Sequence, residues 1–267
     1  AEAAGRTGVR PQPLLTMPGA DDAFVKTGPA SSLPMFEAEA EGLRELAAAN
    51  AVRVPAVVDC GTDNGTAFIA IERLHFERAT TTVEAAFGEQ LADLHRHTKE
   101  QHGWHRDNTI GPTPQHNPWT EDWIDFFREH RLRFQFDLAA RNGYTGELQS
   151  LGDTLQRRLP ELFDDYVPAA SLCHGDLWSG NWGVTDGVPV IFDPAVYYGD
   201  RESDIAMTML FGGFGRAFYR AYEESWPMAQ GHERRLKLYQ LYHVLNHLNL
   251  FGSGYMGQAM KLLRDLA

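Results

Sequence analysis

The segment LCHGDLWSGNWGVTDGVPVIFDPA, residues 172–195, places two carboxylates and an amide close to a short apolar run. Asp176 precedes Asn181 by five positions, and Asp193 directly follows the apolar residues VPVIF. Between them, Asp186-Gly187 suits the type I′ turn of a β-hairpin, because both residue types tolerate positive φ. The segment therefore predicts a polar loop followed by a hairpin that returns Asp193 towards the loop.

These side chains fit the chemistry of phosphoryl transfer. In protein kinases the spacing D-x-x-x-x-N places a carboxylate that accepts a hydroxyl proton and an amide oxygen that binds Mg²⁺ in one catalytic loop. Mg²⁺ prefers oxygen ligands and is usually held by one or two protein groups together with phosphates. We interpret Asp176 as the base and Asn181 and Asp193 as metal ligands. The alternative is that all three only stabilise turns.

The first 70 or so residues predict a small sheet with one helix. Strands are expected at residues 21–27, 53–61 and 66–74, and the turn DNG joins the last two. Residues 31–50 have helical spacing. The apolar face expected for this helix comprises Phe36, Ala40, Leu43, Leu46 and Ala47.

A kinase-type site also needs a strand lysine for the nucleotide phosphates and a helix glutamate that orients the lysine. Lys26 lies in the first expected strand, and Glu37, Glu39 and Glu41 lie in the helix that follows. Glu39 is the best candidate because Leu43 follows on the same face and points it towards the sheet. A solvated lysine and a charged outer helix face are the alternatives.

The rest of the chain predicts helices at residues 81–100, 118–143 and 146–163, and again from residue 204 to the end. We therefore predict an α+β, protein-kinase-like fold of two lobes. A small β-rich N-terminal lobe with one helix is expected at residues 1–73, and a larger, mainly helical lobe at residues 74–267.

Composition limits the classes of partner. The formal net charge is −12, from 24 basic and 36 acidic residues, whereas a nucleic-acid binder needs a basic face. No apolar run approaches the roughly 18 residues of a membrane span. The only cysteines, Cys60 and Cys173, are far apart, and the N-terminal residues lack the apolar core of a signal peptide. We expect a cytoplasmic protein that binds neither nucleic acid nor membrane; its oligomeric state is left open.

Several other polar residues are expected to have structural roles. His95 and His97, at a helix end, are expected on the polar surface rather than around a metal. His174 is expected to support the polar loop by hydrogen bonds, and Asp204 to anchor a helix against it. GGFG, residues 212–215, does not form a dinucleotide-binding fingerprint, because no strand-to-helix turn surrounds it. Its glycines are expected to end a helix.

Larger segments resemble the fructosamine kinases (ketosamine 3-kinases), a branch of the aminoglycoside-phosphotransferase-like kinases. The matching pieces include FVKT, MFEAEAEGLREL, GEQLADLH, LCHGDLWSGN, FDPAVYYGDRESDIAMT and LYHVLNHLNLFG, which together run from about residue 24 to residue 252. HGDxxxxN alone marks only the wider kinase-like superfamily. LWSGN, DPAVYYGDRE and MLFGGF together are much more specific.

The resemblance implies an enzyme that uses ATP and Mg²⁺ to phosphorylate the 3-hydroxyl of ketosamines, the sugar adducts of free or protein-bound amines. The unstable product then releases the amine, which is a deglycation activity. By motif, the resemblance implies that Asp176 is the general base and that Asn181 and Asp193 bind Mg²⁺. It implies that Lys26, paired with Glu39, contacts the phosphates and that Trp178 packs against the sugar. The backbone of Glu72, Arg73 and Leu74 would meet the adenine.

One departure from the family pattern stands before Lys26. Such kinases carry a Gly-rich phosphate loop there, whereas this chain reads AGRTGVRPQPLLTMPGADD, so phosphate-loop residues are left unassigned. Two alternatives stay open: a small-molecule kinase acting on an aminoglycoside, choline or another amino alcohol, and an inactive nucleotide-binding pseudokinase. The ketosamine itself, whether fructosamine, ribulosamine or another, is also left open.

Overall fold

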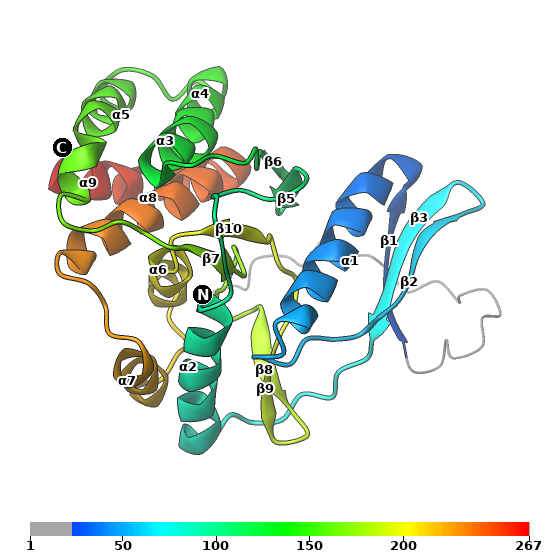
Figure 1. Cartoon of the computed structure of the whole chain (residues 1–267). Coiled ribbons are helices and arrows are strands. Elements are labelled where there is room, and N and C mark those ends of the chain that lie inside the picture. The colour runs from blue at the N-terminus through cyan, green and yellow to red at the C-terminus, as the bar shows by residue number, and fades with distance from the viewer. Residues whose placement is uncertain (1–22, 267) are drawn as a thin grey trace.

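The computed structural model describes residues 23–266, which form a small lobe built on a three-stranded sheet and a larger, mostly helical lobe (Figure 1). This is the α+β two-lobe architecture that the sequence predicts. The strands are β1 Ala23–Pro29, β2 Val57–Asp63, β3 Thr66–Glu72, β4 Thr98–Lys99, β5 Asn108–Ile110, β6 Thr113–Gln115, β7 Ala170–Cys173, β8 Trp182–Thr185, β9 Val188–Ile191 and β10 Tyr197–Gly199. The α-helices are α1 Leu33–Ala48, α2 Thr81–His95, α3 Trp123–Phe127, α4 Phe134–Arg141, α5 Glu147–Arg158, α6 Glu202–Leu210, α7 Arg216–Ser225, α8 His232–Phe251 and α9 Met256–Leu266.

The small lobe is an antiparallel sheet of order β1-β3-β2 covered by α1. Asn64 and Gly65 have φ values of 47° and 81°, so the predicted tight turn between β2 and β3 is present. Its core is separate from that of the large lobe and consists of Phe36, Ala40, Leu43, Ala67, Ile69 and Ile71. The expected face of α1 is therefore mostly correct, but Ala47 is exposed because the sheet does not reach the last turn of the helix.

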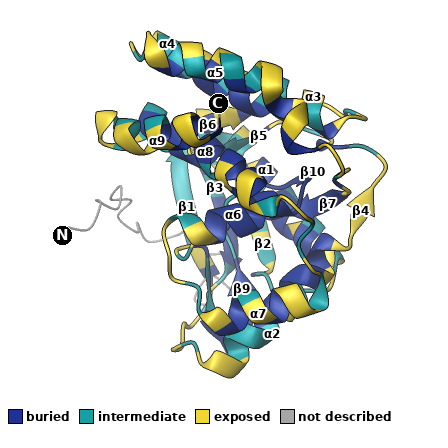
Figure 2. Ribbon diagram, turned by 90° about the vertical axis from the view of Figure 1, so that its left-hand side faces the viewer, coloured by how far each residue is buried: buried dark blue, intermediate teal, exposed yellow. Residues whose placement is uncertain are grey.

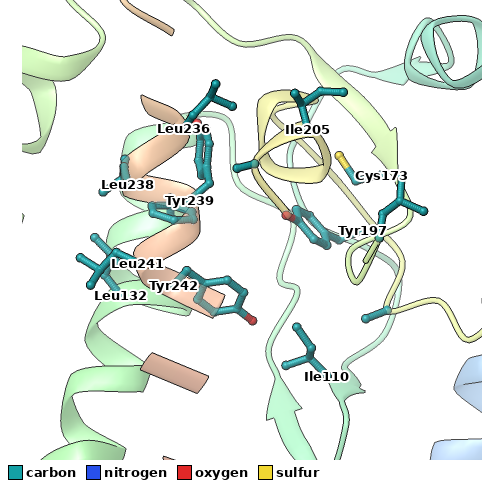
Figure 3. Packing of buried hydrophobic residues seen from close by; sticks show 14 of the residues in the cluster. Ile110, Leu132, Cys173, Tyr197, Ile205, Leu236, Leu238, Tyr239, Leu241 and Tyr242 are labelled. Atoms are coloured by element: carbon teal, nitrogen blue, oxygen red, sulfur yellow. The ribbon is translucent and has the colours of Figure 1, made fainter. Parts of the chain in front are cut away.

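The large lobe is organised around α8. Side chains on several sides of this helix are buried. Figure 3 shows Tyr239 and Tyr242 on the side of α8 that faces Ile205 and Tyr197, and Leu238 and Leu241 on the opposite side, near Leu132. Figure 2 shows that α6 is buried along most of its length. Together, α6 and α8 form a close-packed apolar core on which the neighbouring polar loops rest.

A β-hairpin of the large lobe also reaches the small lobe. We name residues 106–115, which include β5 and β6, the bridging hairpin. Arg106 Nη1 donates to Glu41 Oε1 on α1 at 2.7 Å. On its other side, Asn108 Nδ2 donates to the carbonyl of Val196 at 2.8 Å and Gln115 Nε2 to that of Ala195 at 3.0 Å. One short hairpin therefore ties α1 to residues 195–196.

Two helices of the large lobe are joined by a buried ion pair. Arg235 on α8 contacts both carboxylate oxygens of Glu202 on α6, at 2.8 and 2.9 Å, and the two side chains are 2% and 0% exposed. Beside them, Asp200 accepts hydrogen bonds from the hydroxyls of Tyr166 and Tyr239. These contacts fix the start of α6.

Breaking this pair is expected to destabilise the fold. In Glu202→Ala the Arg235 guanidinium stays buried without its counter-ion, so we expect the free energy of unfolding to fall by about 3 kcal/mol. Urea denaturation followed by circular dichroism measures the change. Arg264→Ala, which removes an ion pair with Glu147 that is 60% exposed on each side, is the control and should cost less than about 1 kcal/mol. Equal midpoints for Glu202→Ala and the unsubstituted protein would contradict the prediction.

Some boundaries differ from those that the sequence predicts. The helix expected at 81–100 ends at His95, because Thr98–Lys99 pairs with β7 instead. The helix expected at 118–143 begins at Trp123 and contains a π-helical turn at Arg128–Arg133. The strands β4, β5, β6, β7 and β10 were not predicted, since two to four residues are too short for a periodic pattern.

Two further expectations concern the ends of the small lobe. The start of the strand expected at 21–27 and the unassigned phosphate loop fall in residues 1–22, outside the described residues. The lobe boundary expected between residues 73 and 74 falls directly after β3, in the connector 73–80, and stays a prediction. Within residues 23–266, no helix has the length and apolar character needed to cross a membrane.

Candidate active site

The polar loop at residues 174–181 runs from the buried end of β7 to the start of β8. Asp204, in the first turn of α6, accepts the backbone N–H groups of His174 at 2.7 Å and Gly175 at 2.9 Å. Burial acts to raise the pKa of Asp204, but His95, His174 and the Gly175 N–H outweigh it, so the pKa is lowered. An ionised carboxylate therefore anchors the loop, as expected for Asp204.

His174 supports the same loop from inside. Its Nε2 lies 3.0 Å from the carbonyl of Phe192, and its Nδ1 accepts the backbone N–H of Asp176 at 3.3 Å. Burial lowers the pKa of His174, which favours the neutral ring with its proton on Nε2. The ring is therefore fully engaged in orienting the loop, the role expected from the sequence.

The loop packs closely on residues 193–195 because position 175 is a glycine. Gly175 has a φ of 84°, and a Cβ there would lie 2.0 Å from the carbonyl oxygen of Ala195. The Ala195 N–H donates to the carbonyl of His174 at 2.8 Å. Only a residue without a side chain permits this approach, which brings Asp193 next to the loop.

Asp176 and Asn181 face each other across the loop. Asn181 Nδ2 donates to the Asp176 carbonyl at 2.9 Å and to Asp176 Oδ2 at 3.2 Å. Burial raises the pKa of Asp176 to about 7, although the Asn181 hydrogen bond opposes the shift. The arrangement gives a half-buried carboxylate, held in one orientation, that can accept a proton from a bound hydroxyl.

Lys26, Glu39 and Asp193 also come together, from β1, α1 and the end of the β8–β9 hairpin. Lys26 Nζ lies 2.7 Å from Glu39 Oε1 and 2.5 Å from Asp193 Oδ1. Burial acts to lower the pKa of Lys26, but the two carboxylates outweigh it and the pKa is raised, so the lysine is charged. Burial raises the pKa of Glu39 against the opposing effect of Lys26. The expected lysine–glutamate contact is thus present, and Glu41 binds Arg106 instead.

The oxygen atoms of Asn181 and Asp193 suit a magnesium ion. The hydrogen bonds of the Asn181 side chain within residues 23–266 all use Nδ2, which leaves its carbonyl oxygen Oδ1 available. Asp193 has a φ of 56°, a left-handed conformation that non-glycine residues adopt mainly at constrained sites, and its side chain is 44% exposed. An amide oxygen and an accessible carboxylate are the hard ligands that Mg²⁺ prefers.

The connector beyond β3 has the features of an adenine-binding segment. The Glu72 carboxylate accepts hydrogen bonds from Arg53 at 2.7 Å and from the Ala56 N–H at 3.1 Å, and the Glu72 N–H donates to the carbonyl of Ala56 at 2.8 Å. Within residues 23–266, the backbone groups of Arg73 and Leu74 have no hydrogen-bond partner.

An aromatic pair that sequence reasoning missed lies beside this connector. Phe76 is 59% exposed, and its ring centroid is 5.3 Å from that of Phe192, the residue before Asp193. No sequence signal joins these positions, because the contact spans more than a hundred residues. The two rings are tilted by 46° to each other and form an apolar contact between the connector and the residue before the metal-ligand candidate Asp193.

Trp178 lies on the outer side of the loop. Its indole covers Gly180, where a Cβ would come within 2.3 Å of the ring, and the side chain is 39% exposed. The ring centroid is 6.4 Å from that of Phe211, just after α6. An accessible aromatic face is therefore held two residues from Asp176, where the family resemblance implies contact with a sugar.

His95 was placed wrongly by the sequence analysis. It is fully buried, with Nδ1 2.8 Å from the Tyr222 hydroxyl and Nε2 3.3 Å from Asp204 Oδ2. His95 continues the buried face of Phe87 and Leu91 at four-residue spacing, a signal that could have identified it. His97 is exposed, as expected.

His95, Cys173 and Asp204 form a group whose ligand atoms all lie within 4.8 Å of one another. Burial raises the pKa of the Cys173 thiol, which keeps it protonated, and its Sγ donates to the carbonyl of Ser171 at 3.4 Å. A metal ion needs the thiolate. The group therefore serves as a hydrogen-bonded support beneath the loop.

Several known proteins are similar to this chain in sequence and in fold. The fructosamine kinase family model matches residues 8–267. A probable ketoamine kinase of Synechocystis is 46% identical over 244 residues, covering 91% of this chain and 82% of that protein. A chloroplastic protein-ribulosamine 3-kinase of Oryza sativa is 43% identical over 246 residues, covering 91% and 71%. The crystal structure of a putative fructosamine-3-kinase from Haemophilus somnus superposes with a TM-score of 0.85 at 31% identity, covering 91% and 83%.

Proposed function

The chain belongs to the fructosamine kinase family, and we propose that it transfers the γ-phosphoryl group of MgATP to the 3-hydroxyl of a ketosamine. The observation that carries this proposal is the convergence of Asp176 and Asn181 on one loop with Lys26, Glu39 and Asp193 beside it. A phosphotransferase needs such an arrangement, because phosphoryl transfer depends mainly on positioning and charge neutralisation. Relatives of this chain are named as a probable ketoamine kinase, a protein-ribulosamine 3-kinase and a ketosamine-3-kinase.

The assignment of roles follows the contacts. Asp176 orients the acceptor hydroxyl and accepts its proton, while Asn181 holds the Asp176 carboxylate in place. Lys26, oriented by Glu39, binds phosphate oxygens. Asn181 Oδ1 and Asp193 would hold Mg²⁺, which neutralises phosphate charge when bound.

The adenine is assigned to the connector. The unpartnered backbone groups of Arg73 and Leu74 suit the hydrogen-bonding edge of the base, and the Phe76–Phe192 pair suits its face. We propose this position because it leads from the connector towards Asp193, where the phosphates must lie. Both cysteines are free, which suits the reducing cytoplasm that we propose as the compartment.

The acceptor is tested with a panel of amines. Purified protein and MgATP are incubated with fructosyl-lysine, ribulosyl-lysine, kanamycin and choline, and ADP release and the product are followed. We expect turnover of at least one ketosamine, with phosphate on O3 by NMR, and none of kanamycin or choline. Turnover confined to kanamycin or choline would leave a kinase of the same fold and remove the ketosamine assignment.

Trp178→Ala tests the sugar contact within the same assay. Loss of the aromatic face should raise KM for the ketosamine about tenfold, the size of one well-packed aromatic contact, while KM for ATP changes little. Trp119→Ala, which removes another exposed tryptophan, is the matched control. Equal KM values for the ketosamine in Trp178→Ala and the unsubstituted protein would remove Trp178 from the acceptor site.

A further inference from the structure

A series of buried hydrogen bonds joins the helices α2, α6 and α7, labelled in Figure 1, beneath the loop that carries Asp176. Arg201 Nη1 donates to the Tyr222 hydroxyl at 2.9 Å, and this hydroxyl lies 2.8 Å from His95 Nδ1. On the other side of the ring, His95 Nε2 lies 3.3 Å from Asp204 Oδ2. None of these four side chains is more than 4% exposed. We name Arg201, Tyr222, His95 and Asp204 the support network.

Donor chemistry fixes the direction of the support network. A guanidinium has only donors, so the Tyr222 hydroxyl accepts from Arg201 and gives its own hydrogen to His95 Nδ1. Burial lowers the pKa of His95, so the ring is neutral, and because Nδ1 accepts, the proton is on Nε2. This N–H faces Asp204, the carboxylate that already accepts two backbone N–H groups of the loop.

The contact between Tyr222 and His95 depends on a close approach of α2 and α7. Gly88 lies two turns before His95 on the same face of α2. A Cβ at Gly88 would be 2.3 Å from the carbonyl oxygen of Phe218 and 2.9 Å from the backbone nitrogen of Tyr222. The glycine therefore lets the backbone of α7 rest on α2, which holds Tyr222 against the last turn of that helix.

The other end of the support network is anchored between α7 and α8. Arg201 donates to the carbonyl of Trp226 at 3.1 Å and to that of Pro227 at 2.6 Å. The guanidinium carbon also lies 4.2 Å from the centroid of the Trp226 indole. These contacts hold the guanidinium in place and leave the Tyr222 hydroxyl one favourable orientation.

The support network leads to the residue proposed as the base. Asp204 accepts the N–H of His174, whose Nδ1 accepts the backbone N–H of Asp176 at 3.3 Å. We propose that Tyr222 and His95 are positioning residues for phosphoryl transfer, which act through Asp204 to set the orientation of the Asp176 carboxylate. Both are too deeply buried to contact a substrate. This inference rests on the proposed function and adds to it two residues from α2 and α7.

Tyr222→Phe tests the inference because it removes the hydroxyl and keeps the ring. We expect kcat to fall about tenfold, since a small displacement of a catalytic group lowers the rate steeply. KM for ATP and for the ketosamine should change less than twofold, because Lys26, Asp193 and Trp178 are held by other contacts. Tyr219→Phe, one turn earlier on α7, is the matched control and should keep kcat.

Two substitutions of His95 separate the hydrogen bond from packing. Glutamine places an amide N–H near the position of Nε2 and still donates to Asp204, whereas phenylalanine fills the space without a donor. We expect kcat to fall at least tenfold in His95→Phe and less than threefold in His95→Gln. Urea midpoints ensure that each kcat refers to folded protein, and long-range ¹H–¹⁵N spectra of the unsubstituted protein should place the His95 proton on Nε2.

Three results would each overturn the inference and leave the ketosamine kinase function standing: an unchanged kcat in Tyr222→Phe, equal losses in His95→Phe and His95→Gln, or a His95 proton on Nδ1. If His95→Phe does not fold, Tyr222→Phe and the NMR position of the proton decide. A protein that phosphorylates no acceptor would remove the proposed function itself, and this inference with it.

Discussion

We expect Asp193→Ala to abolish detectable turnover and to weaken Mg²⁺-dependent ATP binding sharply. Asp193 is the accessible carboxylate beside Asn181 and Lys26, so its loss would take away a proposed protein ligand of the ion and leave the lysine with Glu39 alone. Because the cation neutralises the charge that develops on the phosphates, we expect kcat to fall by more than about 10³. Isothermal titration calorimetry with ATP, in Mg²⁺ and in EDTA, measures the binding change.

Asp186→Asn is a suitable control for this variant, because asparagine tolerates the φ of 51° at this turn position. Asp186 lies in the turn of the same β8–β9 hairpin, and its side chain is 77% exposed. Its replacement should leave turnover and MgATP affinity close to those of the unsubstituted protein. An Asp193→Ala protein that binds MgATP with unchanged affinity would show that Asp193 has only a structural role.

Asp176→Asn should lower kcat by a factor between about 10² and 10⁴, the usual contribution of a positioned general base, with the fold and ATP affinity retained. The amide has the shape of the carboxylate but cannot accept the hydroxyl proton. Steady-state kinetics at saturating ketosamine measure kcat, and calorimetry measures ATP affinity.

The same substitution at an exposed aspartate, Asp186→Asn, separates loss of charge from loss of the base. That variant should keep its activity, since asparagine accepts the positive φ of the turn. Near-normal kcat in Asp176→Asn would exclude Asp176 as the base.

Sequence reasoning found the parts of this site that lie in one local pattern. Asp176 and Asn181 stand in a fixed spacing, and Asp186-Gly187 specifies the hairpin that returns Asp193, so three residues could be placed together before the fold was known. Lys26 is 167 positions from Asp193. Its place could be inferred only from what the chemistry requires of a neighbouring strand and helix.

The parts that were missed depend on tertiary contacts. The bridging hairpin has strands of three residues, too short for alternation to be visible, and is held by side chains of α1 and by backbone groups at residues 195–196. His95 was misplaced because histidines at a helix end are usually solvated, whereas here α7 and Asp204 cover the last turn of α2. In the sequence alone Phe76 looks like an ordinary linker residue, because its contact with Phe192 forms only in the folded protein.

The bridging hairpin has a thermodynamic consequence for the nucleotide site. The hairpin binds α1, which carries Glu39, and also residues 195–196, which follow Asp193. A shift of α1 relative to residues 195–196 would therefore break hydrogen bonds to the hairpin. The conformational entropy needed to bring the side chains of the proposed phosphate site together is then lost during folding. Ligand binding costs less additional entropy as a result. Preorganisation of this kind raises the binding-competent fraction of molecules, and a higher fraction brings the apparent dissociation constant for nucleotide nearer to its intrinsic value.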